Sequence, residues 1–235
     1  MRSTAPPDAH AHFAEHGYAR VAGAMDEAVR SLCASYALRK ARGSAAHPLG
    51  AFELCTQVPE GALRLYGDEL MQSVLAGMQP LMEGITGKEL TPTYAFTRLY
   101  FEGSELKRHT DRPACEFSAS VTLAYRDGSP WPLHIEGPQG VAEIALAPGD
   151  LIAYRGELPH WREAYHGTGC MQVFLHYVDA AGPNAGEAFD GKEGNRPATW
   201  DEVARVYRKQ RALLDLQARV RDVTQDGEQS AHSAE

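Results

Sequence analysis

Long apolar runs, paired cysteines and an excess of basic residues are all missing from this sequence of 235 residues. The apolar runs are far shorter than the roughly 20 residues that a membrane-spanning helix needs, and the N-terminus lacks the apolar core of a signal peptide. The 23 basic residues are outnumbered by 31 acidic ones, giving a net charge of −8. Such a balance argues against binding to nucleic-acid phosphates. We expect a cytoplasmic protein with no membrane or nucleic-acid partner.

The four cysteines are far apart in the chain, at positions 33, 55, 115 and 170, and none forms a Cys-x-x-Cys pair. This spacing is typical neither of a zinc ribbon nor of a disulfide scaffold, so we expect reduced thiols. Apolar residues make up 43% of the chain, which is enough for one well-packed domain with appended helices. The sequence leaves the oligomeric state unknown.

The N-terminal part of the chain, from residue 8 to about residue 90, has mainly helical patterning and is expected to support the rest of a single domain. Asp26 is placed to cap one helix, and a second long helix is predicted from about Asp68 to Ile85. Pro80 should bend or divide that second helix. A short strand is expected within Gly17–Val21.

Residues 91–179 have a different pattern, in which short apolar segments alternate with turn residues. The regular spacing of these segments predicts an antiparallel sandwich or barrel of the jelly-roll type. The predicted strands are Thr93–Phe101, Phe117–Tyr125, Val141–Leu146, Leu151–Tyr154, His160–Tyr165 and Met171–Tyr177.

The C-terminal region follows a loop rich in Gly, Asn and Pro. A helix is predicted over residues 198–223, and the polar residues 225–235 are expected to be disordered. The buried face of this helix is predicted to consist of Val203, Val206, Leu213, Leu214 and Leu216.

A candidate metal site begins with His109 and Asp111. Residues two apart on an extended chain point to the same face, so this imidazole and carboxylate are aimed at one point. A histidine on a neighbouring strand would complete the triad of non-haem iron(II) oxygenases, which leaves positions open for other ligands. His160 is the best candidate because it follows a Pro-Gly-Asp turn and a strand. The alternative interpretation of His109 and Asp111 is a surface charge pair.

Several segments, taken in this order, resemble the 2-oxoglutarate/iron(II) dioxygenase superfamily, and within it the prolyl-4-hydroxylase-like branch. The similarity covers most of the chain to about residue 179. The segments are Phe13–Tyr18, Leu99–Gly103, His109–Asp111, Val121–Tyr125, Ala147–Asp150 and His160. The resemblance implies a double-stranded β-helix, or jelly-roll, core buttressed by N-terminal helices and a C-terminal helix. It also implies Fe(II) as cofactor and 2-oxoglutarate and O2 as cosubstrates.

The resemblance further implies an enzyme that hydroxylates an unactivated C–H bond and releases succinate and CO2. Desaturation and cyclisation are related outcomes. Family halogenases have Gly or Ala where this chain has Asp111, so the carboxylate favours hydroxylation over halogenation. We expect a small-molecule or amino-acid-derived substrate. Two alternatives stay open: a cupin-like isomerase or dioxygenase that does not use 2-oxoglutarate, and a jelly-roll binding module whose three metal-site residues do not converge.

The far carboxylate of 2-oxoglutarate needs polar partners. Tyr100 resembles the family tyrosine that hydrogen-bonds this carboxylate, although a core aromatic residue is the alternative interpretation. The family Lys or Arg on the strand after the distal histidine is missing from Cys170–Tyr177. Gln172 and His176 lie there instead, and Gln172 is included in the predicted cosubstrate site.

Arg162 is the predicted replacement for the missing cation. It lies on the same strand and face as His160, and its guanidinium suits a carboxylate. Arg98 is a second candidate, or else a substrate-binding residue. Arg162 could instead pair with an acid such as Glu163 or contact the substrate. Trp131 and His176 are the remaining candidates for substrate binding.

Overall fold

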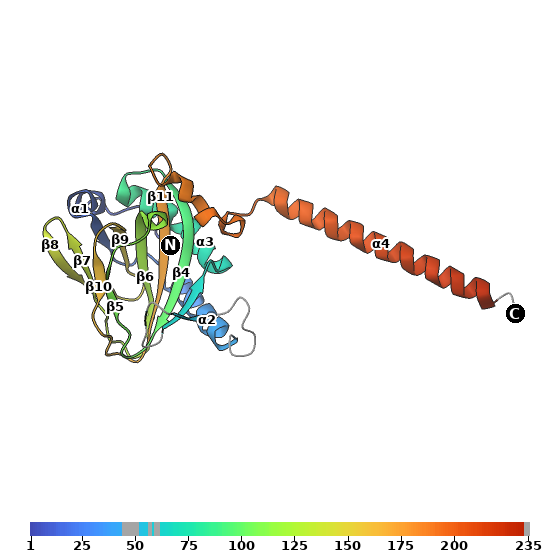
Figure 1. Ribbon diagram of the computed structural model, residues 1–235, viewed down its shortest axis with the longest axis horizontal. Coiled ribbons are helices and arrows are strands. Elements are labelled where there is room, and N and C mark those ends of the chain that lie inside the picture. Colours follow the sequence, from blue (N-terminus) through green and yellow to red (C-terminus); the bar gives the residue numbers. More distant parts are fainter. Residues whose placement is uncertain (44–51, 56–57, 59–61, 233–235) are drawn as a thin grey trace. The chain divides into compact units, whose positions relative to one another are not determined.

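The computed structural model describes residues 1–43, 52–55, 58 and 62–232. The chain divides into two compact units, Met1–Arg196 and Pro197–Glu235. In the described ranges, the first unit contains the sheets, three α-helices and three short 3-10 helices, and the second contains a single helix (Figure 1). Among the described residues, no helix combines the length and the apolar character needed to cross a membrane.

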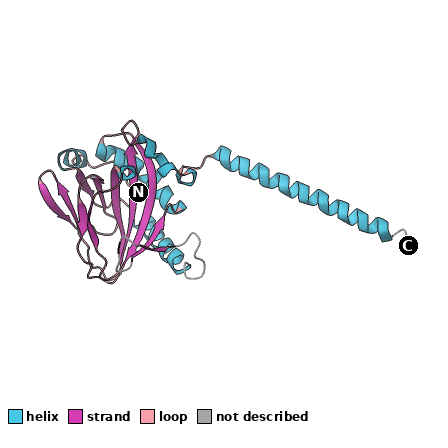
Figure 2. Ribbon diagram, viewed as in Figure 1, coloured by secondary structure: helices cyan, strands magenta, loops and turns pink. Residues whose placement is uncertain are grey.

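Two antiparallel sheets form the centre of the first unit (Figure 2). Together they make the jelly-roll architecture that the strand spacing predicts. In order across the larger sheet the strands are β1 (Tyr18–Val21), β9 (Leu151–Arg155), β6 (Phe117–Tyr125), β11 (Cys170–Asp179), β4 (Leu90–Tyr100), β3 (Ala62–Tyr66) and β2 (Glu53–Cys55). In the smaller sheet they are β5 (Leu106–His109), β10 (His160–Arg162), β7 (Leu133–Gly137) and β8 (Gly140–Ile144).

The larger sheet has an outer face that packs on the helices and an inner face that points toward the smaller sheet. On β11, Val173 and Leu175 join the helix-facing core, whereas Phe174 and His176 line a pocket on the other side. This alternation follows from the two-residue period of a strand. The same alternation places Tyr94, Phe96 and Arg98 of β4 on the pocket side.

The helices of the first unit are α1 (Ala9–His16), α2 (Glu27–Gly43) and α3 (Glu69–Thr86). Helix α3 contributes eight buried residues and lies beside β4 (Figure 1). The Asp68 carboxylate caps it by accepting hydrogen bonds from the backbone N–H groups of Leu70 and Met71, at 3.1 and 3.3 Å. Of the two expected effects of Pro80, a bend or a division, the division does not occur, because α3 continues through Pro80 as one helix.

Four of the observed strands were not expected from the sequence. Strands β2 and β3 lie in the part predicted to be mainly helical, and β5 and β7 are the missing partners of β10 in the smaller sheet. These strands are only three to five residues long. Such short segments carry little periodicity of their own and are stabilised by their neighbours.

Helix α4 (Trp200–His232) forms the second unit. It extends beyond the predicted end at residue 223, so that residues 225–232, expected to be disordered, are helical. The predicted buried face was also wrong, because its five residues are all at least half exposed: Val203, Val206, Leu213, Leu214 and Leu216. A single helix has no second layer of its own against which to bury an apolar stripe.

Candidate metal centre and its pocket

The three predicted metal-site residues lie together at one point of the smaller sheet. His109 ends β5 and His160 begins β10, and the two are directly paired across these strands. Asp111 follows β5, and its backbone N–H donates to the carbonyl oxygen of Gly156 at 2.7 Å. The Nε2 atoms of both histidines lie 3.8 Å from Oδ1 of Asp111. One ligand atom from each residue lies within 4.8 Å of the others.

Hydrogen bonds fix the orientation of all three side chains. The Nδ1 atoms of His109 and His160 lie 2.8 and 2.9 Å from the carbonyl oxygens of Lys107 and Leu158. Because a carbonyl oxygen only accepts, Nδ1 carries the proton and Nε2 keeps its lone pair for a metal. The Ser118 hydroxyl donates to Oδ2 of Asp111 at 3.1 Å, leaving Oδ1 toward the two rings.

Burial lowers the pKa of His160, so this imidazole is neutral near neutral pH. The neutral form is the one that binds a metal. The donor set of two imidazoles and one carboxylate, held by hydrogen bonds at their far sides, therefore fits the iron(II) triad.

A second trio shares the Asp111 carboxylate with the buried residues Cys115 and His176. Burial raises the pKa of Cys115 to about 12, and the Tyr94 hydroxyl lies 3.1 Å from its sulfur. At neutral pH Cys115 is thus a thiol, and the thiolate is the metal-binding form. This trio fits a metal less well than the histidine pair does. Cys115 has no ligand-like spacing in the sequence, so no pattern there pointed to it.

A pocket of about 650 Å³ opens beside the triad. All three triad residues line it, and so does the predicted substrate residue His176. Its aromatic wall is formed by Tyr66, Tyr94, Phe96, Tyr154 and Phe174. Its cationic residues are Arg64, Arg98, Lys107 and Arg112.

Arg98 is the predicted site residue that lines this pocket from β4. Its side chain is buried, and its guanidinium carbon lies 4.8 Å from the centre of the Phe96 ring and 5.9 Å from that of Phe174. Nη1 donates to the Tyr100 hydroxyl at 3.3 Å. Burial raises the pKa of Tyr100, which therefore keeps its proton. Tyr100 itself does not reach the pocket surface.

Arg162 lies behind the pocket wall and is only 1% exposed. It donates to the Trp131 carbonyl oxygen and, through Nη2, to Oε1 of Gln172 at 2.9 Å. Among the described residues no carboxylate pairs with Arg162, so the alternative of a pair with Glu163 does not occur. Two buried atoms beside this contact, Nε of Arg162 and Nε2 of Gln172, have no hydrogen-bond partner in the part of the chain that the structure describes.

The structure does not bring Trp131 to the pocket. Its side chain is 3% exposed and packs edge-on against Tyr100, with ring centres 4.7 Å apart. Its indole N–H donates to the Glu163 carbonyl oxygen at 2.7 Å. Trp131 thus forms part of the wall behind Arg98 and Arg162 rather than a surface for substrate.

Solved structures resemble this chain over most of its length. The epimerase SnoN from nogalamycin biosynthesis, described as non-haem and alpha-ketoglutarate-dependent, has a TM-score of 0.61 at 15% identity, with 82% of this chain and 95% of that one covered. A prolyl-4-hydroxylase from Pseudomonas putida has a TM-score of 0.56 at 20% identity, covering 73% and 97%. EctD from S. alaskensis with bound Fe has a TM-score of 0.60 at 16% identity, covering 75% and 77%.

The chain has the 2-oxoglutarate/iron(II) oxygenase fold. This confirms the predicted fold class, a jelly-roll core supported by helices. No protein-family model and no curated protein matches the sequence.

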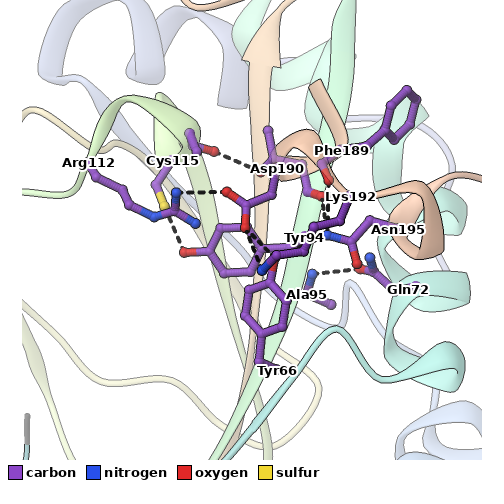
Figure 3. A network of polar contacts seen from close by, with 12 residues as sticks. Tyr66, Gln72, Tyr94, Ala95, Arg112, Cys115, Phe189, Asp190, Lys192 and Asn195 are labelled. Atoms are coloured by element: carbon purple, nitrogen blue, oxygen red, sulfur yellow. Dashed lines mark hydrogen bonds and ion pairs between the residues drawn. The ribbon is translucent and has the colours of Figure 1, made fainter. Parts of the chain in front are cut away.

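A polar network that the sequence did not indicate connects Tyr66 and Arg112 of the pocket lining to Asp190 (Figure 3). Asp190 lies in a 3-10 segment (Ala185–Gly191) and accepts hydrogen bonds from the Tyr66 hydroxyl and from Nζ of Lys192, the latter at 3.2 Å. It also pairs with Nη1 of Arg112 at 2.7 Å. Burial alone would raise the pKa of Asp190, but these three donors outweigh it and lower the pKa to about 2.

The backbone around Asp190 is strained. Phe189 and Asp190 have φ values of 56° and 53°, and no other non-glycine residue in the described ranges has a positive φ. The buried Asn195 side chain stabilises this shape, because its amide donates to the Phe189 carbonyl oxygen and the Tyr66 hydroxyl, both at 3.1 Å. The strained backbone, the Asn195 contacts and the donors to Asp190 together fix the Asp190 carboxylate beside Arg112.

Proposed function

We propose that this chain is an iron(II)- and 2-oxoglutarate-dependent oxygenase. The observation that carries the proposal is the convergence of His109, Asp111 and His160 beside a pocket of about 650 Å³ on this fold. Solved proteins of the same fold include one in complex with Fe3+ and alpha-ketoglutarate. When bound, iron(II) and 2-oxoglutarate would supply the oxidation of a C–H bond by O2, with release of succinate and CO2.

The residues of the chain have separate tasks in this proposal. His109, Asp111 and His160 hold the metal on one side and leave the pocket side for other ligands. The aromatic wall excludes water from the reacting groups, which strengthens electrostatic contacts inside the pocket. The Asp111 carboxylate favours hydroxylation of a small-molecule or amino-acid-derived substrate over halogenation.

For the far carboxylate of 2-oxoglutarate, we favour Arg98 over Arg162. Arg98 lines the pocket, and the buried Tyr100 hydroxyl behind it accepts a hydrogen bond from its guanidinium and so helps to hold it in place. A guanidinium is a strong partner for a carboxylate. Arg162 reaches the same region only through Gln172, so it supports the wall from behind. Gln172 lies directly opposite Arg98 across β11 and β4.

An anaerobic titration with Fe(II) and 2-oxoglutarate, followed by visible absorption, tests this proposal. His160→Ala should lose iron binding, because one of three ligands is gone. Arg98→Gln should weaken 2-oxoglutarate about tenfold or more, as expected for one charge-assisted hydrogen bond, with iron affinity unchanged. Arg162→Gln is the matched control. A larger loss in Arg162→Gln would move the anchor to Arg162, and full iron binding by His160→Ala would refute the triad.

A cupin-like metalloenzyme that does not use 2-oxoglutarate is the second candidate. It is favoured by β11, whose ten residues include no Lys or Arg. In that case the wild-type protein would bind the metal, and 2-oxoglutarate would change neither the absorption spectrum nor the metal affinity.

A further inference from the structure

The charges that line the pocket are strongly one-sided. In the described part of the chain, Asp111 is the only pocket-lining carboxylate, whereas four cations line the same cavity. With Asp111 assigned to the metal and Arg98 to the cosubstrate, three cations are left over. They are Arg64, Lys107 and Arg112.

Arg112 is the most firmly held of these three cations. Its partner Asp190 has a side chain only 10% exposed. By contrast, the Glu53 partner of Arg64 is 66% exposed, and Lys107 is itself 74% exposed. Exposed ion pairs fix side-chain positions weakly, because solvent screens them and both side chains lose rotamer freedom. Of these three cations, the fold thus holds only Arg112 in a defined place.

Arg112 also has a free side that faces the pocket. Its guanidinium carbon lies 4.7 Å from the centre of the Tyr94 ring, and one nitrogen pairs with Asp190. The side chain is nevertheless 48% exposed, and a guanidinium carries five N–H donors. It directly follows the candidate metal ligand Asp111 in the chain, so a group bound by it lies near the reaction centre.

The backbone strain at Asp190 indicates that the position of this carboxylate matters. Non-glycine residues held at positive φ are strained, and they persist where the surrounding structure stabilises them. Here Tyr66, Lys192 and Asn195 provide that support. The same network holds Tyr66 against Tyr94 in a stacked pair with ring centres 4.9 Å apart.

We propose that Arg112 binds an anionic group of the primary substrate, a carboxylate or a phosphate, and that Asp190 is the positioning residue that orients Arg112. The planar guanidinium suits both anions. The neighbouring aromatic wall of Tyr66, Tyr94 and Phe96 suits an apolar or planar body attached to that anion. The inference rests on the proposed function, since it takes the triad and Arg98 as already occupied.

The first test compares three probes that share one ring and differ in charge. Phenylacetate, phenyl phosphate and neutral phenylacetamide are titrated calorimetrically into the anaerobic protein loaded with Fe(II) and 2-oxoglutarate. We expect at least one anion to bind about tenfold or more tightly than the amide, and the better anion distinguishes carboxylate from phosphate recognition. Equal or weaker binding of both anions would overturn the proposal.

The second test uses variants of the pocket cations. Arg112→Gln should weaken the preferred anion about tenfold or more, whereas Arg64→Gln, the matched pocket control, should weaken it less than threefold. Asp190→Asn should produce a smaller loss in the wild-type background and no further loss in the Arg112→Gln background. A purely structural role would instead lower the thermal midpoint in both backgrounds and leave anion affinity alone. An equal loss in Arg64→Gln would refute the assignment to Arg112.

The affinity for 2-oxoglutarate, measured on the same variants, separates the two proposals. It should be unchanged in Arg112→Gln and Asp190→Asn, which also shows that these variants are folded. If Arg112→Gln loses anion binding but keeps its affinity for 2-oxoglutarate, the result supports the role of Arg112 and leaves the proposed function unaffected. If the wild-type protein fails to bind 2-oxoglutarate, the titrations are repeated without it: the proposed function then fails, and the charge preference still decides the role of Arg112.

Discussion

Gly156 is the residue against which the metal-binding loop packs. A Cβ atom there would lie 2.0 Å from the Cys115 carbonyl oxygen and 3.0 Å from Cβ of Asp111. Gly156 also accepts the Asp111 N–H through its carbonyl oxygen and donates its own N–H to the Glu116 carbonyl oxygen. The close approach of these backbones requires a residue without a side chain.

We predict that Gly156→Ala displaces Asp111 and weakens metal binding. The added methyl group has no free volume, so the loop must move, at a cost of about 1–3 kcal/mol of unfolding free energy. Fe(II) affinity by anaerobic titration and urea denaturation measure the two effects. Gly186→Ala is the control, since a Cβ there meets no atom within 4 Å. Unchanged Fe(II) affinity in Gly156→Ala would show that the loop does not position Asp111.

We predict that His176 makes the unfolding free energy of the protein depend on pH. Burial lowers its pKa from 6.5 to about 4. Between these values the unfolded chain binds a proton that the folded protein does not, so the unfolding free energy falls as the pH falls from 6.5 to 4. The drop is at most about 3 kcal/mol for the metal-free protein. Denaturation in urea across this pH range measures it.

The contribution of His176 is isolated by substitution. His176→Phe keeps a ring beside Tyr94 and removes the titration, so its stability should depend less steeply on pH. His166→Gln, at an exposed position, should keep the wild-type slope. The same slope in His176→Phe and wild type would assign the pH dependence to other groups.

At the scale of single residues, the sequence predicted those site residues whose positions depend only on spacing along one strand. His109 and Asp111 share a face because they are two residues apart, and the Pro-Gly-Asp turn leads to His160. Cys115, Arg112 and Asp190 had no such signal. Asp190 reaches Arg112 from a segment with positive φ values at two residues, which no local pattern in the sequence indicates.

At the scale of elements, long segments were predictable and short ones were not. The strand Phe117–Tyr125 was predicted with its observed bounds, and helix α3 was predicted to within a residue or two. Both have enough apolar positions to show a period. Strand β5 has only four residues, of which two are charged, and it is defined by pairing with β10, a contact between distant parts of the chain. The pocket lies between such elements and could not be inferred from either alone.

At the scale of the whole molecule, the two units should be separable. Every residue of the buried apolar clusters in the described chain precedes residue 179. We predict that deleting residues 197–235 shifts the thermal midpoint by less than about 2 °C, which corresponds to a change of at most about 1 kcal/mol for a unit of this size. Calorimetry of the full and shortened chains measures this shift. A fall of 5 °C or more would show that α4 stabilises the first unit.

Five residues on adjacent strands form a single row across the larger sheet, and Arg98, the proposed anchor for the cosubstrate, is one of them. Arg64 pairs with Arg98, Arg98 with Gln172, and Gln172 with Thr122, with Glu53 at the end beside Arg64. Adjacent strands are only about 4.8 Å apart, less than the length of an arginine side chain. An arginine at one position of the row can therefore place its guanidinium at nearly the same point as an arginine at the adjacent position. In the proposed site, the anchoring cation lies on β4, one strand away from β11, and it precedes the metal-site residues in the sequence instead of following them. Relatives of this chain are better sought by sheet register than by spacing along the sequence.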